Sequence, residues 1–334
     1  MNTEHVDIGL ARFSDWAFTS SVVVLVVALL LLAVELAYSR GRKVESRELV
    51  GAAAAATSNV SATVGADSST PGVDAAEPKR PLGERVRKAG LALVYVGIGL
   101  LLVCIVLRGL ATARVPWGNM YEFINLTCFS GLIAAAVVLR RPQYRALWVF
   151  VLVPVLILLT VSGRWLYTNA APVMPALQSY WLPIHVSVVS IGSGVFLVAG
   201  VASILFLLKM SPLGTPGTES VGRRIVARLP DAQTLDRIAY RTTIFAFPVF
   251  GFGVIFGAIW AEEAWGRYWG WDPKETVSFI AWVVYAAYLH ARSTAGWRDR
   301  KAAWINVVGF VAMVFNLFFI NLVTVGLHSY AGVG

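Results

Sequence analysis

The sequence predicts an all-α, polytopic integral membrane protein with about eight transmembrane helices and with both termini outside the membrane. The first observation is composition. Apolar residues occupy 57% of the 334 positions and charged residues only 14%, whereas soluble proteins carry about 25% charged residues. The second is that long uncharged runs recur along the chain, close to the length of about 20 residues that a helix needs to cross a bilayer.

Eight of these runs are predicted to be membrane spans. The first follows a polar-leaning stretch and is too long for the core of a signal peptide, so we expect a true first helix. The third, fourth and seventh lie near the shortest length that crosses a bilayer, about 17 residues. The ranges are 20–36, 89–107, 123–139, 146–162, 185–207, 242–261, 276–291 and 303–327.

Lys and Arg residues are distributed unevenly between the two predicted faces. Of the 28 basic residues, 22 fall in the segments after the first, third, fifth and seventh spans, and six fall elsewhere. Basic residues near span ends stay in the cytoplasm, so these four segments are expected inside. The net charge of +9 follows from this topology. The basic residues form no continuous stripe, so we expect membrane lipid and no nucleic acid as a partner.

Three regions are expected. Residues 1–38 form an external tail and the first transmembrane helix. Residues 39–88 are rich in Ala, Ser and Gly and are expected to form a disordered cytoplasmic linker, because they contain few large apolar side chains. Residues 89–334 form a seven-helix membrane domain, with an external tryptophan-rich loop at 260–275.

Four aromatic rings crowd into seven residues of this loop: Trp265, Tyr268, Trp269 and Trp271. Tryptophan at a membrane edge is ordinary, so an interfacial belt is one interpretation. The crowding of rings between glycines favours a platform for a flat ligand. Asp272, which follows the rings, is expected either to cap the next helix or to contact that ligand.

Two of the four histidines are predicted to lie beside this platform. Even numbers of crossings separate His185, the loop and His328, so all three share one membrane face. Imidazole is a common iron ligand, and a flat aromatic wall with a histidine on each side suits haem with two axial nitrogens. For each histidine the alternative is an interfacial residue bonded to backbone or water.

His290 is expected near the cytoplasmic end of the seventh span. An ionisable side chain within a span is a functional candidate, and the alternative is a side chain that snorkels to the inner interface. Cys104 and Cys128 fall inside spans and are expected to be small buried residues. The absence of a Cys-x-x-Cys or Cys-x-x-Cys-His motif argues against a thiol oxidoreductase and against covalently attached haem.

The segment 265–275, together with 326–330, resembles the haem-handling proteins of cytochrome c maturation, and in particular the CcsA (ResC) type of the system II synthase. The tryptophan-rich loop is similar to their WWD domain. Residues 119–123, 179–182 and 236–241 extend the resemblance, which covers about 115–331.

The resemblance implies a role for each candidate residue. His185 and His328 match two external axial haem ligands, and Trp265, Trp269, Trp271 and Asp272, with Tyr268 beside them, match the loop that cradles haem. His290 resembles the transmembrane histidine of a second, inner haem position, whose other ligand comes from a partner subunit of the CcsB (ResB) type.

The resemblance also implies a transport route and partners. Haem b, bound without covalent bonds, would pass from the inner to the external position and be attached to the Cys-x-x-Cys-His motif of apocytochrome c. The chain would be a subunit of holocytochrome c synthase, with haem lyase activity in this chain or at its interface with the partner. A thioredoxin-like reductant of the apocytochrome thiols is a further expected partner. The expected location is the plasma membrane of a bacterium rather than a thylakoid.

Two other functions stay open on the residues alone. One is a solute permease with an aromatic gate, although such transporters tend to show broken spans or paired half repeats, and neither is visible. The other is a membrane electron carrier that uses bound haem.

Overall fold

A computed structural model describes residues 6–58, 82–172, 177–214, 220–320, 323–324 and 326–328. Every regular element within these ranges is a helix, which confirms the all-α prediction. Among the described residues, seven helices are long and apolar enough to cross a membrane. The chain is therefore a multi-pass membrane protein.

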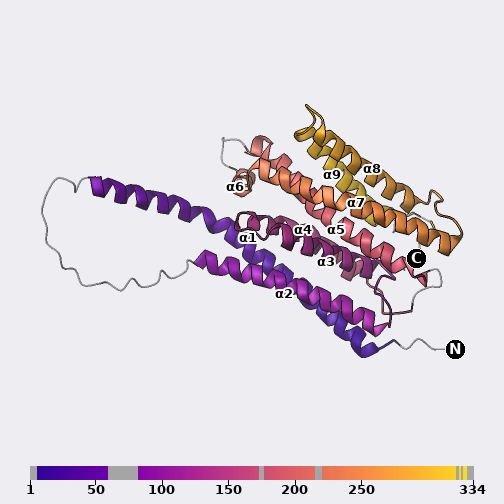
Figure 1. The fold of residues 1–334 in the computed structure, drawn as a ribbon. Coiled ribbons are helices and arrows are strands. Elements are labelled where there is room, and N and C mark those ends of the chain that lie inside the picture. The colour runs from indigo at the N-terminus through magenta and orange to yellow at the C-terminus, as the bar shows by residue number, and fades with distance from the viewer. Residues whose placement is uncertain are drawn as a thin grey trace, which may run out of the picture.

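The long helices lie side by side in one elongated bundle (Figure 1). One flank is formed by α1 (Ile8–Ser58) and α2 (Leu82–Ala111), the middle by α3 (Met120–Val138) and α4 (Trp148–Trp165), and the other flank by α5 (Trp181–Lys209), α7 (Ala232–Trp265), α8 (Pro273–Ser293) and α9 (Arg300–Phe315). Short elements join or extend them: η1 (Pro142–Leu147), η3 (Pro212–Gly214), α6 (Val221–Arg228) and the π-helical η4 (Asn316–Ile320). The closest partners are α1 with α2 and α5 with α7.

The seventh of the eight predicted spans corresponds to α8, which is not among the seven apolar helices. Its ends are polar, with Glu275 in the first turn and His290 and Arg292 in the last. At about 1.5 Å per residue, its 21 residues extend over roughly 30 Å, and it packs against α7 and α9. Because α8 runs along the bundle with its neighbours (Figure 1), the tryptophan loop and the segment after α9 meet at one end.

Part of the predicted disordered linker is helical in the structure. Residues 39–58 continue α1, and residues 82–88 form the first turns of α2. The continuation contains five successive alanines at 52–56, and alanine has the highest helix propensity. Residues 59–81 lie outside the described residues.

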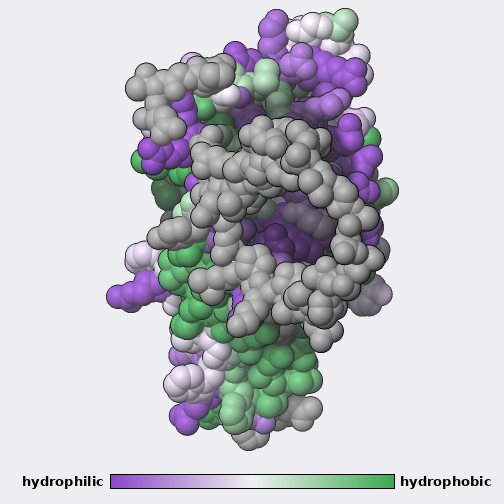
Figure 2. Space-filling view, turned by 90° about the vertical axis from the view of Figure 1, so that its left-hand side faces the viewer, coloured by the Kyte–Doolittle hydropathy of each residue, from purple (hydrophilic) through white to green (hydrophobic). Residues whose placement is uncertain are grey.

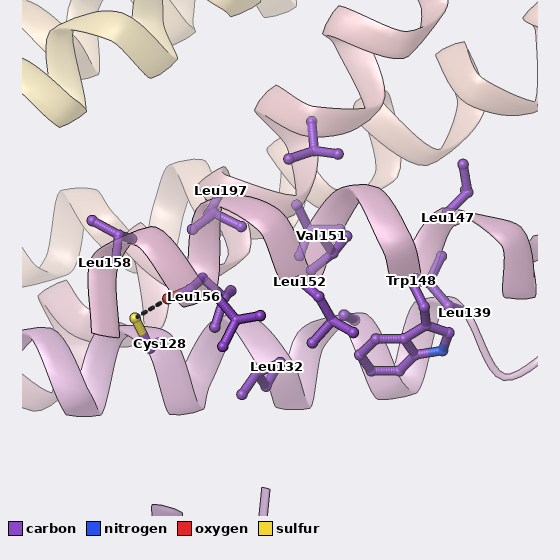
Figure 3. Close-up of a cluster of buried hydrophobic side chains, with 14 of the residues drawn as sticks. Cys128, Leu132, Leu139, Leu147, Trp148, Val151, Leu152, Leu156, Leu158 and Leu197 are labelled. Atoms are coloured by element: carbon purple, nitrogen blue, oxygen red, sulfur yellow. Dashed lines mark hydrogen bonds between the residues drawn. The ribbon is translucent and has the colours of Figure 1, made fainter. Parts of the chain in front are cut away.

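Buried apolar side chains join α3, α4 and α5 in the middle of the bundle (Figure 3). Cys128 and Leu132 on α3, four residues apart, share one helix face and belong to the same buried cluster as Leu152 of α4 and Leu197 of α5. Trp148, 1% exposed, closes one end of the cluster. Cys104 and Cys128 are both buried and unbridged, in line with a packing role.

The two ends of the bundle carry different loops. Seen from the left-hand end of Figure 1, hydrophilic residues gather over the upper part of the face and apolar residues over the lower flank (Figure 2). The α8–α9 turn at this end is basic, and Arg292 Nη2 pairs with Asp236 Oδ2 at 2.5 Å. The positive-inside rule predicts that this end faces the cytoplasm. The tryptophan loop lies at the other end.

Candidate functional site

A cavity of about 350 Å³ reaches from the tryptophan-loop end of the bundle into its interior. Its volume lies at the lower end of the range for small-molecule sites, about 300–1,000 Å³. The inner wall is largely apolar and comes from α3, α4, α5, α7 and α9. The outer part brings together His185, His328, Tyr268 and Trp269. Two histidines that are 143 positions apart in the sequence thus supply their imidazoles to one cavity.

His185 lies near the start of α5, and its Nδ1 is 2.7 Å from the carbonyl oxygen of Gly253 on α7. A carbonyl oxygen only accepts hydrogen bonds, so Nδ1 must carry the proton. The lone pair of the neutral ring is then on Nε2. This is the nitrogen that a histidine offers to a metal when its other nitrogen is held by a backbone carbonyl.

One face of α7 is shaped to receive this ring. Gly253, Gly257 and Trp260 follow at helical spacing and therefore point the same way. A Cβ atom at Gly257 would lie 2.6 Å from Cε1 of His185, so only glycine leaves room for the imidazole. Trp260, 1% exposed, stacks on the same imidazole with centroids 6.0 Å apart and planes 12° apart.

His328 follows α9, and its Nδ1 is 2.8 Å from Oδ2 of Asp272. Burial lowers the pKa of His328 below its usual value, and the bond to Asp272 opposes this only in part. Burial on its own raises the pKa of Asp272, but hydrogen bonds from His328 and from the Leu327 amide outweigh it, so that this pKa is lowered. The pair is therefore a neutral imidazole that donates from Nδ1 to a carboxylate, with its lone pair on Nε2.

Asp272 serves the fold and the site at once. It is the N-cap of α8 and forms a capping box with Glu275, as the Asp-x-x-Glu spacing favours. Its Oδ1 accepts the backbone N–H of Leu327 at 2.7 Å. Glu275 Oε2 in turn accepts the N–H of Gly270 at 2.9 Å. The carboxylate of Asp272 thus joins the tryptophan loop to the segment that carries His328.

The four aromatic residues of the loop lie in three different environments. Tyr268 and Trp269 line the cavity. Trp265 packs edge-on against His328 with centroids 5.0 Å apart. Trp271 is 67% exposed, contacts Trp269 and has a φ of +56°, which is rare for a bulky residue. Such strained backbone persists where surrounding structure holds it and clusters at functional sites.

Two cations of the loop region are placed differently. Lys274 lines the cavity, and its Nζ lies 5.8 Å from the ring centroid of Phe123, another cavity residue. The guanidinium of Arg267 lies against Gly270, where a Cβ would be 2.1 Å from Cζ. Of the two, Lys274 is the one positioned to pair with an acidic group in the cavity.

His290 lies apart from the cavity. It is exposed in the last turn of α8, roughly 27 Å along the helix from Asp272 at about 1.5 Å per residue. Its carbonyl oxygen accepts the Oγ–H of Ser293 at 2.8 Å and the Oγ1–H of Thr294 at 2.9 Å. Within this chain the imidazole faces outward, where another subunit can reach it.

A buried ion-pair cluster supports the outer wall of the cavity. Glu122 is 3% exposed and accepts hydrogen bonds from Arg108 Nε at 3.1 Å and Arg114 Nη1 at 3.0 Å. Arg108 also donates to the Thr168 carbonyl, and Arg114 to the Ala171 carbonyl at 3.0 Å. The cluster ties the α2–α3 connection, whose residues 117–119 line the cavity, to the α4–α5 connection.

Sequence reasoning did not identify Trp260 or the Glu122 cluster as parts of this site. Trp260 packs against both histidines, since its ring centroid also lies 5.8 Å from that of His328. The glycine spacing on its helix face was visible in the sequence as a Gly-x-x-x-Gly pattern, which is typical of close helix packing in membranes.

The fold and the cavity together define a class: a multi-pass helical membrane protein that presents two neutral imidazoles in one aromatic-lined cavity. The chain belongs to the cytochrome c assembly protein family, whose model matches residues 117–328. This membership assigns it to cytochrome c maturation and to the handling of haem. The predicted relationship of the chain to the proteins of cytochrome c maturation is thereby confirmed.

Several relatives carry the name cytochrome c biogenesis protein CcsA. That of Gloeobacter violaceus is 33% identical over 67% of this chain and 80% of its own length. That of Crocosphaera subtropica is 35% identical over 67% of this chain and 82% of its own. That of Guillardia theta is 33% identical over 71% of this chain and 85% of its own.

Proposed function

We propose that this chain holds haem at the external end of the bundle and presents it for attachment to apocytochrome c. One observation carries the proposal. His185 and His328 reach the same cavity, and each is fixed through Nδ1 by an acceptor, Gly253 O or Asp272 Oδ2. Both rings therefore offer Nε2, as a pair of axial haem ligands requires.

The rest of the cavity suits a porphyrin. Tyr268, Trp269 and Phe123 supply aromatic surface for a flat apolar ring system, and Lys274 supplies a cation for a propionate. Two imidazoles fill both axial positions of the iron and so exclude oxygen. These contacts are all non-covalent, which fits haem b carried as cargo and released later.

Attachment requires no change of oxidation state in the cargo overall. Each thiol of the Cys-x-x-Cys-His motif adds across a vinyl group: a sulfur–carbon bond forms, and the thiol hydrogen moves to the neighbouring vinyl carbon. The residues of this chain hold and orient the haem while the apocytochrome supplies both thiols and a new axial histidine. A thioredoxin-like reductant is the proposed source of reduced thiols.

The proposed assembly is a holocytochrome c synthase with a CcsB (ResB) type partner in the plasma membrane of a bacterium. The loop of 266–272 faces outside. The exposed imidazole of His290 supplies one ligand to an inner haem position, and the partner supplies the other. Haem passes from that position to the external one.

The absorption spectrum of the purified protein tests the external site. His185→Ala and His328→Ala should each change the visible bands of bound haem and abolish cytochrome c maturation, and free imidazole should restore part of both. Unaltered spectra in both variants would remove the ligand assignment. A stoichiometric haem that is never lost to apocytochrome c would instead indicate a membrane electron carrier.

A further inference from the structure

The two histidines of the cavity differ in the group that holds Nδ1. For His328 the acceptor is the carboxylate of Asp272 at 2.8 Å. For His185 it is the backbone carbonyl of Gly253 at 2.7 Å. The two bonds are nearly equal in length, and they differ in the charge of the acceptor.

A charged acceptor affects an imidazole more strongly than a neutral one. A hydrogen bond to a carboxylate is about twice as strong as a neutral one, and it raises the basicity of the ring as a metal ligand. The side chain of Asp272 is only 4% exposed, and a low local dielectric strengthens this effect. Nε2 of His328 is therefore the stronger electron-pair donor of the two.

The surroundings of His328 also fix its position more firmly. Asp272 holds the neighbouring Leu327 amide at 2.7 Å and is itself fixed as the N-cap of α8. Trp265 packs against the ring, with centroids 5.0 Å apart. Movement of His328 away from the cavity would break the bond to the carboxylate and leave a buried charge without this partner, which is costly.

We propose that His185 is the exchangeable axial ligand of the external site and that His328, held by Asp272, is the retained one. The inference rests on the proposed function. When the histidine of the substrate arrives, the bond between iron and Nε2 of His185 breaks and a bond to the substrate imidazole forms. The electron pair of the broken bond stays on Nε2 of His185, and no electron or proton is transferred. Asp272 is a positioning residue in this scheme, because it acts through His328.

A double-mutant cycle tests the asymmetry. The full-length chain, purified with its accompanying subunits, carries His290→Ala so that only the external site is measured. Haem affinity is compared in His185→Gly and His328→Gly, each with and without Asp272→Asn. Asparagine is as good an N-cap as aspartate, so α8 keeps its start, and size-exclusion chromatography checks that each variant is folded.

His185→Gly, which keeps His328, should bind haem about tenfold more tightly than His328→Gly. Loss of the hydrogen-bonding partner of a metal ligand lowers affinity about 10- to 100-fold, and the expected difference is at the lower end of that range. Asp272→Asn should remove about tenfold of affinity in the His185→Gly background and less than about twofold in the His328→Gly background. A purely structural role of Asp272 would lower affinity equally in both backgrounds, and that result would overturn the inference.

The haem reduction potential gives a second readout. A carboxylate that is hydrogen-bonded to the axial histidine stabilises ferric iron more than ferrous iron. Asp272→Asn alone should therefore raise the reduction potential, by about 59 mV for each tenfold decrease in the ratio of ferric to ferrous haem affinity. An unchanged potential overturns the role of Asp272. A wild-type protein without bound haem would overturn the proposed function as well, whereas bis-histidine haem with equal responses in the two backgrounds overturns this inference alone.

Discussion

Gly257 on α7 faces His185 on α5 so closely that a Cβ atom there would lie 2.6 Å from the imidazole Cε1. Gly257→Ala should therefore displace the ring and lower haem content, because overpacking of this kind costs about 1–3 kcal/mol. Pyridine haemochrome measurements on purified protein report the loss.

Gly99→Ala is the matched control, because a Cβ at Gly99 on α2 meets nothing within 4 Å. In a helix interior this substitution should leave haem content unchanged and stabilise the fold by about 0.5–1 kcal/mol. Equal haem content in the two variants would contradict the close fit between α7 and His185.

Trp269 and Trp271 should differ in their effect on haem retention. Trp269 lines the cavity, whereas Trp271 is 67% exposed. Loss of one aromatic contact costs about 0.5–1.5 kcal/mol, so Trp269→Ala should weaken haem binding roughly 2- to 12-fold and Trp271→Ala should have a smaller effect. Haem titration followed by tryptophan fluorescence quenching measures both. The reverse order would mean that haem rests on the outer side of the loop.

Glu122→Ala should destabilise the outer wall of the cavity. It would remove the 3.1 Å contact between Arg108, 1% exposed, and Glu122 and leave Arg108 with only the longer, 3.6 Å ion pair to Asp15. Breaking a buried ion pair costs about 3–5 kcal/mol. Thermal unfolding in detergent should show a lower midpoint, with faster proteolysis at 166–172. Glu262→Ala removes an exposed carboxylate and serves as the control. Equal midpoints would show that the ion pairs contribute nothing to stability.

The predicted topology can be read by thiol labelling in intact cells. Arg267→Cys should react with a membrane-impermeant reagent, because the positive-inside rule places the loop outside. Ala295→Cys, at the other end of α8, should react only after lysis. The native cysteines are 1% and 0% exposed, so their background is low. The opposite pattern would invert the orientation.

His290→Ala should affect haem only in the assembled complex. The imidazole is exposed in this chain, and the second ligand of the proposed inner haem comes from the partner. The isolated chain therefore offers a single ligand, which is too little to hold an inner haem firmly. Haem content should fall in the complex with its partner and stay the same in the isolated chain. Unchanged occupancy in the complex would make His290 a structural residue.

The local features of the site were predictable from sequence. The Asp-x-x-Glu spacing predicts a capping box at Asp272, and crossing parity predicts that His185 and His328 share a face. The contact between Asp272 and His328 joins residues 56 positions apart, and no local pattern specifies such a pair. The acceptor for His185 is a backbone carbonyl, which is common to every residue type and leaves no mark in the sequence.

Composition and the spacing of apolar residues determined on their own that this chain is a helical, multi-pass membrane protein, because a bilayer imposes a length and a polarity on each span. The histidines and the aromatic loop could be recognised as candidate site residues because they interrupt the apolar pattern of the spans. Helix packing alone decided which of these residues face the cavity, which nitrogen of each imidazole carries the proton and which aromatic ring lies outside. Those choices depend on distances between helices that are remote in the chain, and only the folded structure sets such distances.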